Sequence, residues 1–372
     1  MENVPGKSSF KDRPDPMHEK SSILNKSTSF HTHKDPIQGH SAPNNDVSNV
    51  TGDVDEASKK IEALIDVLSS VKERSDLPNI SEDVETFSNM VGSQIDKYIR
   101  HEAPMKFGRD LKQDTTLINT VSLLSRLHNL LDQISPDEKV RPSLSLTAPV
   151  VQRAMAFMEK ELRILLQEGS EETKKPEEEE MKYPGFKQDT IENIRRIVGA
   201  MISGGYHKDC SHAYTSLRKD AVKEAMKHQG FDSVSNEDVQ KMQWETLEGH
   251  IADWVKVTKQ VAKVLLPGEN NLCVSIFFPD HPSVGESIIT NLTKPVVTSL
   301  LNLAEAVSLT KKSAERLFKL LDLYEALTDL MAALDSSKCS NSCISEVKSE
   351  MLVIRRRLRE TCLLYTSPSP RD

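Results

Sequence analysis

Apolar residues recur at steps of three and four through residues 235–269, and this spacing constrains the fold more than any other feature. Such steps place side chains on one face of an α-helix. Ser235 can cap the start of the helix with Asp238 three positions later, and Pro267 with Gly268 can end it. The sequence therefore predicts one long amphipathic helix. Its expected inward face consists of Trp244, Leu247, Ile251, Trp254, Val257, Val261 and Leu265.

Both tryptophans of the chain, Trp244 and Trp254, lie on this face. Because aromatic residues make up only 5% of the chain, two large rings on one helix indicate a core position. The pattern is typical of a core helix in an all-helical protein. Periodicity alone does not indicate a function.

The same spacing recurs from about residue 55, and it predicts four helices before residue 170. In the fourth, Pro149 suits the first helical turn and Gly169 suits the end. Each apolar stripe needs a partner, and short connections favour antiparallel packing of neighbours. The first three stripes are Ile61, Leu64, Ile65, Leu68 and Val71; then Val84, Phe87, Val91, Ile95 and Tyr98; then Leu117, Val121, Leu124, Leu127, Leu131 and Ile134.

Further helices are predicted in the second half. Asp189 is expected to cap one that ends at Gly204, and another runs from His207 to Gly230. In a later helix Pro295 is tolerated in the first turn, and deeper it produces a kink that costs about 3 kcal/mol. Two last helices have the inward faces Leu317, Leu320, Leu321, Tyr324, Leu327 and Leu334, after a cap at Ser313, and Val347, Met351, Ile354 and Leu358.

Composition divides the chain into segments. Residues 1–54 are rich in polar residues and proline and are predicted to be a disordered leader. Residues 55–169 are expected to form N-terminal helices and a first bundle. Residues 170–187, with Glu177–Glu180, form an acidic, proline-containing linker. Residues 188–361 are expected to form the middle bundles. Residues 362–372 break the helical pattern and look like translated adapter sequence, so we expect a non-native tail.

The bulk properties exclude several classes of protein. With 37% apolar and 28% charged residues, the chain fits long helices with wide polar faces better than one compact globule. A net charge of −8 disfavours nucleic-acid binding, which usually needs a basic surface. The few cysteines, the absence of a long apolar segment and the lack of a signal peptide indicate a reducing, cytosolic setting.

No pattern of catalytic or metal-ligating residues stands out, so the sequence predicts neither an enzyme nor a bound metal or cofactor. The pair His31 and His33 has no further ligand nearby, and Cys339 with Cys343 lacks the four ligands of a zinc site. Gly204-Gly205 is not followed by the Lys-Ser/Thr of a phosphate loop. The basic run Arg355–Arg357 would gain about 1 kcal/mol per cation at an anionic membrane, which is too little for an anchor.

Two blocks carry a family resemblance. The first is Val239-Gln-Lys-Met-Gln-Trp-Glu245 with the apolar residues that follow it, and the second is Leu303–Val307 with Ser313–Leu330. In this order and at this separation they resemble the plant-type branch of the seventy-kilodalton subunit of the exocyst. The match is specific over roughly residues 189–334 and looser from Ala57. Its motif residues here are Met242, Trp244, Leu247, Ile251, Trp254, Leu317, Leu321 and Tyr324.

The resemblance implies an elongated rod of consecutive antiparallel helical bundles. It implies a cytoplasmic protein, peripherally recruited to the plasma membrane, that helps to tether secretory vesicles during exocytosis. Other exocyst subunits and the vesicle and plasma-membrane machinery would be its partners. The family uses an N-terminal helix to join other subunits, so the stripe Ile61–Val71 is the candidate interface; the alternative is packing within the chain. The family's phosphoinositide site lies in a C-terminal bundle, and we assign none of its residues to this chain.

A different function is compatible with the same helices. A cytosolic all-helical adaptor would bind peptide motifs of signalling partners. The two hypotheses differ in where the partner binds. In a tether subunit the Ile61–Val71 stripe pairs lengthwise with another helix, whereas in an adaptor the later bundles present a concave groove.

Overall fold

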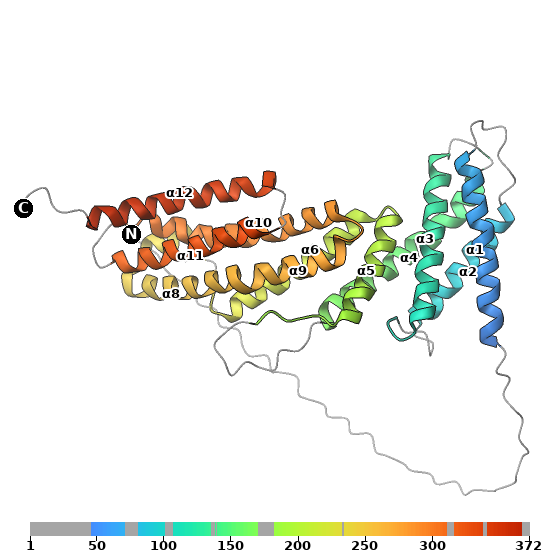
Figure 1. Cartoon of the computed structure of the whole chain (residues 1–372), viewed down its shortest axis with the longest axis horizontal. Helices are drawn as coiled ribbons and strands as arrows, with labels where there is room; N and C mark the ends of the chain where they lie inside the picture. Colours follow the sequence, from blue (N-terminus) through green and yellow to red (C-terminus); the bar gives the residue numbers. More distant parts are fainter. Residues whose placement is uncertain are drawn as a thin grey trace, which may run out of the picture. The chain divides into compact units, whose positions relative to one another are not determined.

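A computed structural model describes residues 46–70, 81–100, 107–134, 138, 140–169, 182–232, 234–310, 316–337 and 341–366. The predicted all-α fold is confirmed, because these residues form helices and the connections between them (Figure 1). The helices are α1 Asp46–Ser70, α2 Ser81–Ile99, α3 Leu111–Gln133, α4 Arg141–Glu168, α5 Gln188–Ser203, α6 His207–His228, α7 Asn236–Lys241, α8 Trp244–Gln260, α9 Leu266–Phe277, α10 Pro282–Ser308, α11 Leu317–Ser336 and α12 Asn341–Thr366.

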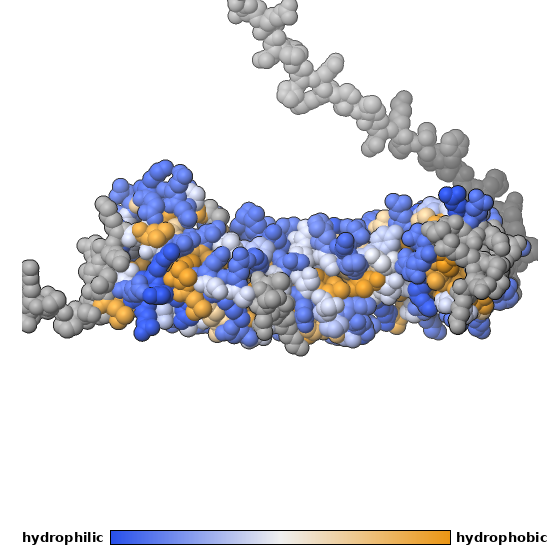
Figure 2. Space-filling view, turned by 90° about the horizontal axis from the view of Figure 1, so that it is seen from above, coloured by the Kyte–Doolittle hydropathy of each residue, from blue (hydrophilic) through white to orange (hydrophobic). Residues whose placement is uncertain are grey.

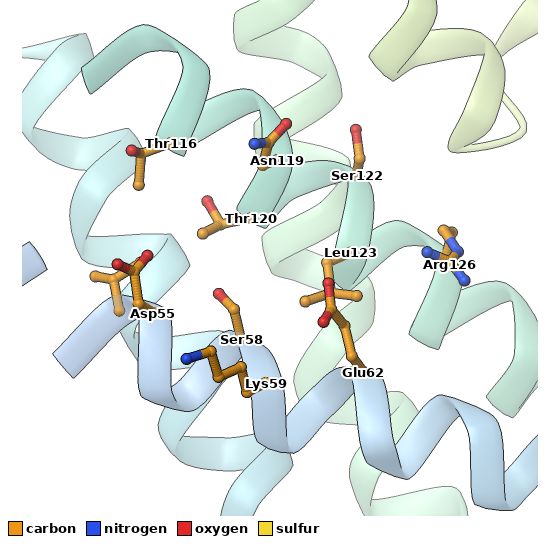
Figure 3. A pocket seen from close by; sticks show the side chains of 11 residues that line it. Asp55, Ser58, Lys59, Glu62, Thr116, Asn119, Thr120, Ser122, Leu123 and Arg126 are labelled. Carbon is orange, nitrogen blue, oxygen red and sulfur yellow. The ribbon is translucent and has the colours of Figure 1, made fainter. Parts of the chain in front are cut away.

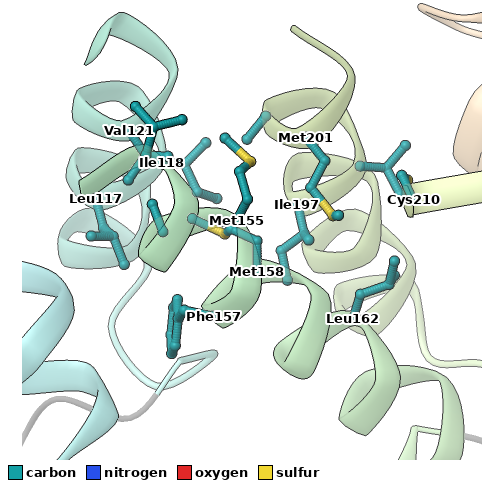
Figure 4. Close-up of a cluster of buried hydrophobic side chains, with 14 of the residues drawn as sticks. Leu117, Ile118, Val121, Met155, Phe157, Met158, Leu162, Ile197, Met201 and Cys210 are labelled. Carbon is teal, nitrogen blue, oxygen red and sulfur yellow. The ribbon is translucent and has the colours of Figure 1, made fainter. Parts of the chain in front are cut away.

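A first hydrophobic cluster contains residues of the five helices α1, α2, α3, α4 and α5. The first half of α6, α9 and the start of α10 also contribute to it. Leu117 of α3, Phe157 and Leu162 of α4 and Ile197 of α5 point into it (Figure 4). The rings of Phe157 and Tyr98 meet edge to face, with centroids 5.9 Å apart. The predicted inward faces of α2 and α3 are therefore buried, apart from the half-buried Ile134.

A second hydrophobic cluster is formed by the end of α6, α7, α8, the rest of α10, α11 and α12. Helix α12 packs against α10 and α11, and the three lie side by side in Figure 1. Helices α6 and α10 each contribute buried residues to both clusters, and so does α9, through Leu266 in the second and Leu272 in the first. These three helices connect the two clusters without an intervening linker.

The long helix predicted over residues 235–269 is wrong at its start. Ser235 does cap a helix, since its Oγ accepts from the Asp238 amide at 3.1 Å, but that helix is the short α7. Met242 and Gln243 are extended, and α8 begins at Trp244. Trp244, the first residue of α8, is only half-buried, whereas Leu247 and the later stripe residues are buried.

Pro267 and Gly268 do not end the helix. After α8, residues Val261–Leu265 form a π-helical turn, and α9 continues directly from Leu266. The Leu266 amide donates to the Val261 carbonyl, five residues earlier. Pro267 then occupies the first turn of α9, where a missing amide hydrogen is tolerated. The wider turn thus lets the chain pass a proline without stopping.

Three further predictions are corrected. Helix α4 begins at Arg141 with Pro142 in its first turn, so Pro149 is an interior residue, and Pro295 is likewise interior to α10. Lys187, not Asp189, is the residue before α5. Leu321 is 44% exposed, because the buried stripe of α11 instead follows Leu320, Leu323, Leu327, Leu330 and Leu334.

Several predictions lie outside the described residues. They concern most of the leader and of the acidic linker, the pair His31 and His33, the cap at Ser313, and Cys339. Nothing is described of the Cys343 side chain. Helix α12 continues to Thr366, beyond the expected break at Cys362, and Cys362 is buried against the second cluster.

Candidate partner-binding surface

The predicted joining stripe of α1 lies in the chain's own core. Ile61, Ile65 and Leu68 are at most 6% exposed in the first cluster, and Leu64 packs against it half-buried. Val71 lies outside the described residues. This burial favours the alternative in which the stripe packs within the chain.

A groove runs beside this stripe, between α1 and α3 (Figure 3). It encloses about 460 Å³. Polar side chains line it, and both signs of charge are present. From α1 these are Asp55, Ser58, Lys59 and Glu62, and from α3 they are Thr116, Asn119, Thr120, Ser122 and Arg126. Such a lining suits contacts with polar side chains of another helix.

The motif residues have structural roles. Trp254 is 1% exposed, and its Nε1 donates to the Leu300 carbonyl of α10 at 2.9 Å. The Arg316 guanidinium lies 4.5 Å from the centre of the Trp244 ring, a cation–π contact at the start of α11. The remaining motif residues Met242, Leu247, Ile251, Leu317 and Tyr324 pack in or against the second cluster, while Leu321 is exposed.

The basic run of α12 is largely paired within the chain. Arg357 Nη1 lies 3.1 Å from Glu305 Oε1 of α10, and Arg356 Nε lies 2.9 Å from Glu360 Oε1. Arg355 stacks 4.9 Å from the centre of the Tyr324 ring and donates to its hydroxyl. Each of these three arginines thus has a contact within the chain, while the Arg356 side chain remains 81% exposed.

A buried ion pair lies where the two clusters meet, and sequence reasoning missed it. Arg218 of α6 and Glu269 of α9 are 4% and 3% exposed. Arg218 Nε donates to Glu269 Oε2 at 3.0 Å and its Nη2 to Oε1 at 2.5 Å, a bidentate arrangement. The only sequence signal is a charged residue on the inward side of each helix, and their 51-residue separation hides the partnership.

Residues just before α5 cover this ion pair. The Tyr183 hydroxyl accepts from Arg218 Nη2 at 3.3 Å, and the Phe186 ring lies 5.3 Å from the guanidinium carbon. Burial raises the pKa of the Tyr183 hydroxyl, with a further upward contribution from the Glu269 charge. Tyr183 is therefore a neutral hydroxyl at physiological pH, and the Glu269 carboxylate accompanies the Arg218 cation inside the protein.

A second buried carboxyl anchors the turn before α3. Asp114 accepts from the Tyr98 hydroxyl at 2.9 Å and from the Gly108 amide at 2.8 Å. Gly108 has φ +85°, which glycine adopts readily. Burial raises the pKa of Asp114, while these two hydrogen bonds oppose the rise. The arrangement fixes a turn and leaves no free acid or base at a surface.

Hydrophilic side chains cover most of the face in Figure 2, and hydrophobic side chains appear there in separate patches. No helix in the described ranges is long and apolar enough to cross a membrane. Within those same ranges, no group of three His, Cys, Asp or Glu side chains is placed to hold a metal ion.

Comparison with known proteins yields one family. Residues 252–365 match the family model for the C-terminal part of the Exo70 protein of the exocyst complex. Over 322 residues, 77% of this chain, it is 32% identical to exocyst complex component EXO70C1 of Arabidopsis thaliana. It is 29% identical over 318 residues to component EXO70C2 of the same plant. The chain spans about half the length of these relatives, 48% and 45%.

The fold is also found among solved structures. The chain superposes on a structure of the exocyst subunit Exo70p with a TM-score of 0.50 and 12% sequence identity. The match covers 76% of this chain and 46% of the other. At this identity the likeness concerns the fold alone.

Proposed function

This chain belongs to the plant-type Exo70 family of exocyst subunits, and on that premise we propose that it acts as an exocyst component in the tethering of secretory vesicles to the plasma membrane. The observation that carries the proposal is the 32% identity over 77% of the chain. The proposed role is assembly by helix packing and involves no catalysis. The proposed location is the cytoplasm, with peripheral recruitment to the plasma membrane.

We place the contact with other subunits on α1 and the α1–α3 groove. The groove has a polar lining with both signs of charge, which fits a partner helix laid along the seam between α1 and α3. The apolar stripe Ile61–Leu68 would be shared with the partner only if α1 moved away from α3, because it is buried in the first cluster. Phosphoinositide binding is not proposed for this chain; in its basic run on α12, Arg356 and Arg357 form ion pairs with carboxylates of the chain itself.

Co-purification of the full chain with the other plant exocyst subunits tests the proposal. Ser58→Arg and Ser122→Arg together should fill the groove from both sides and abolish co-purification, since both serines are half-buried in its lining. Each of these changes adds one positive charge, and the control for each single change is Ser70→Arg, which adds one positive charge at an exposed position of α1 outside the groove.

The outcomes separate the parts of the proposal. If the groove variant and the control both still co-purify with the other subunits, the joining surface lies elsewhere on the chain. Failure of the unmodified chain to bring down any other exocyst protein would contradict its role as an exocyst component. Circular dichroism of each variant shows whether the helices remain folded.

A further inference from the structure

A second concave surface lies far along the chain from the α1–α3 groove, between α6 and α10. It encloses about 300 Å³, and three lysines of α6 line it: Lys219, Lys223 and Lys227. We name this surface the lysine groove. All three lysines are exposed, and in the part of the chain that the structure describes none of them lies in an ion pair. Three cations thus lie together on a chain with a net charge of −8.

The rest of the lysine groove is apolar. Met226 and Phe231 form one side, and Pro295 and Val296 of α10 form the other. Pro295 has no amide hydrogen, so it presents ring carbons and no donor. The Ser299 hydroxyl donates to the Val296 carbonyl at 2.7 Å, so it is already paired within α10. The surface therefore combines a row of cations with a small apolar pocket.

The spacing of the lysines suits an extended peptide. Positions four apart on a helix are separated by about 6 Å along its axis, so the row spans about 12 Å. Alternate residues of an extended chain lie about 6.6 Å apart and share one face. Acidic side chains at alternate positions can thus meet successive lysines, and an apolar side chain on the same face can enter the pocket.

We propose that the lysine groove binds an extended acidic peptide of a partner protein, with one apolar anchor residue among its alternating carboxylates. Charge complementarity supplies attraction and register, and the pocket supplies selectivity for the anchor. The inference is independent of the tethering role, because it uses neither α1 nor α3.

A peptide fits better than an anionic membrane. Asp220 and Glu224 are exposed on α6 next to the lysine row, and Asp232 lies at the groove itself. A flat anionic surface pressed against the lysines would also approach these carboxylates, and like charges repel. A narrow peptide that follows the row avoids two of them.

Fluorescence anisotropy with the full chain tests the inference. The probe is a labelled peptide, Ser-Glu-Ser-Glu-Ser-Glu-Ser-Leu-Ser, with its three successive alternate glutamates and its leucine on one face. We expect saturable binding that weakens as salt rises, because exposed charges are screened within about 10 Å at 0.1 M ionic strength. Replacing the leucine by serine in the probe should weaken binding, and replacing the glutamates by glutamine should abolish it.

Variants of the protein locate the site. Lys223→Glu should weaken binding at least about tenfold, since it reverses the central charge of the row. Lys208→Glu is the matched control: it changes the net charge equally at an exposed position of α6 outside the groove, and it should leave the affinity within about twofold.

Three results would overturn the inference. The first is that the probe does not bind. The second is that Lys223→Glu and Lys208→Glu weaken binding equally. The third is that the affinity changes neither when the leucine is replaced nor when Lys223 is changed to Glu. A parallel experiment measures binding of the same protein variants to phosphatidylserine vesicles, because an anionic membrane is the other possible ligand. If vesicles bind in a way that depends on Lys223 and the peptide does not bind, the ligand of the lysine groove is an anionic membrane and not a peptide.

Discussion

Trp254 connects two helices through both its ring and its nitrogen. The side chain is 1% exposed in the second cluster, and its Nε1 donates to a carbonyl of α10 at the position of Leu300. Carbonyls of a helix interior already accept from the helix, so this bond adds a second donor to one acceptor. Trp254 thus couples α8 to α10 through the buried ring and through a directional hydrogen bond.

Trp254→Ala should lower the free energy of unfolding by about 3–5 kcal/mol, because it removes a large buried ring and leaves a cavity. Trp254→Phe keeps much of the apolar volume and should lose less than the alanine variant. Urea denaturation followed by circular dichroism measures both. A midpoint that hardly moves in the alanine variant would mean that the ring does not pack as described.

The Arg218–Glu269 pair makes a different prediction, because each charge depends on the other. Arg218→Met alone should destabilise the fold by about 3–5 kcal/mol, since Glu269 would remain as a buried unpaired carboxylate. Changing Glu269 to Met as well should recover part of that loss. The measurement is a double-mutant cycle in urea, and additive effects of the two changes would contradict direct coupling.

At the scale of elements, the sequence predicts the helices but not all of their ends. Steps of three and four identify the buried faces of α2, α3 and α12, because burial of one face imposes that period. Pro149, Pro267 and Gly268 suggested boundaries, yet each lies within a helix. A proline inside a helix removes one backbone hydrogen bond and crowds the carbonyl one turn earlier, and tertiary packing on both sides can outweigh that cost.

The candidate sites were less predictable than the helices. The α1 stripe is visible in the sequence, but whether another chain or α3 covers it depends on three-dimensional packing. The lysine groove requires Pro295 and Val296 to face a row of lysines about 70 positions earlier, and no local pattern encodes that pairing. The spacing of Lys219, Lys223 and Lys227 was nevertheless present in the sequence as a signal.

Gly268 and Gly249 both lie in helices but have different surroundings, so alanine variants of the two can be compared. A Cβ on Gly268, at the start of α9, would collide with the Tyr183 ring, whereas one on Gly249 of α8 meets nothing within 4 Å. Gly268→Ala should therefore destabilise the fold by about 1–3 kcal/mol. Gly249→Ala should stabilise it by up to about 1 kcal/mol through helix propensity.

Thermal unfolding of the two glycine variants measures the contrast. If both raise the melting temperature, residues 182–187 do not press against α9 as described. If both lower it, the position of Gly249 is more crowded than the structure indicates.

At the scale of the molecule, two hydrophobic clusters share three continuous helices. Because α6, α9 and α10 carry buried residues in both, one cluster cannot unfold without fraying elements of the other. The Arg218–Glu269 pair lies in this shared region, with Tyr183 against it. We therefore expect residues 81–362 to unfold as one cooperative unit.

Leu162→Ala tests that cooperation. Leu162 is fully buried in the first cluster, so its truncation should cost about 2–5 kcal/mol. Both tryptophans belong to the second cluster, and their fluorescence reports on it. The variant should lower the fluorescence midpoint and the circular-dichroism midpoint together. A fluorescence transition that stays at the original temperature would show that the clusters unfold independently.

Each of the two hydrophobic clusters contains a buried cysteine thiol. Cys210 lies in the first cluster and Cys362 in the second. Burial raises the pKa of Cys210 to about 12, so little of the reactive thiolate is present at neutral pH. Alkylating reagents should modify each of these residues only when its surroundings open. The order in which the two cysteines acquire the added mass of the alkyl group then shows which cluster opens first, without any substitution in the protein.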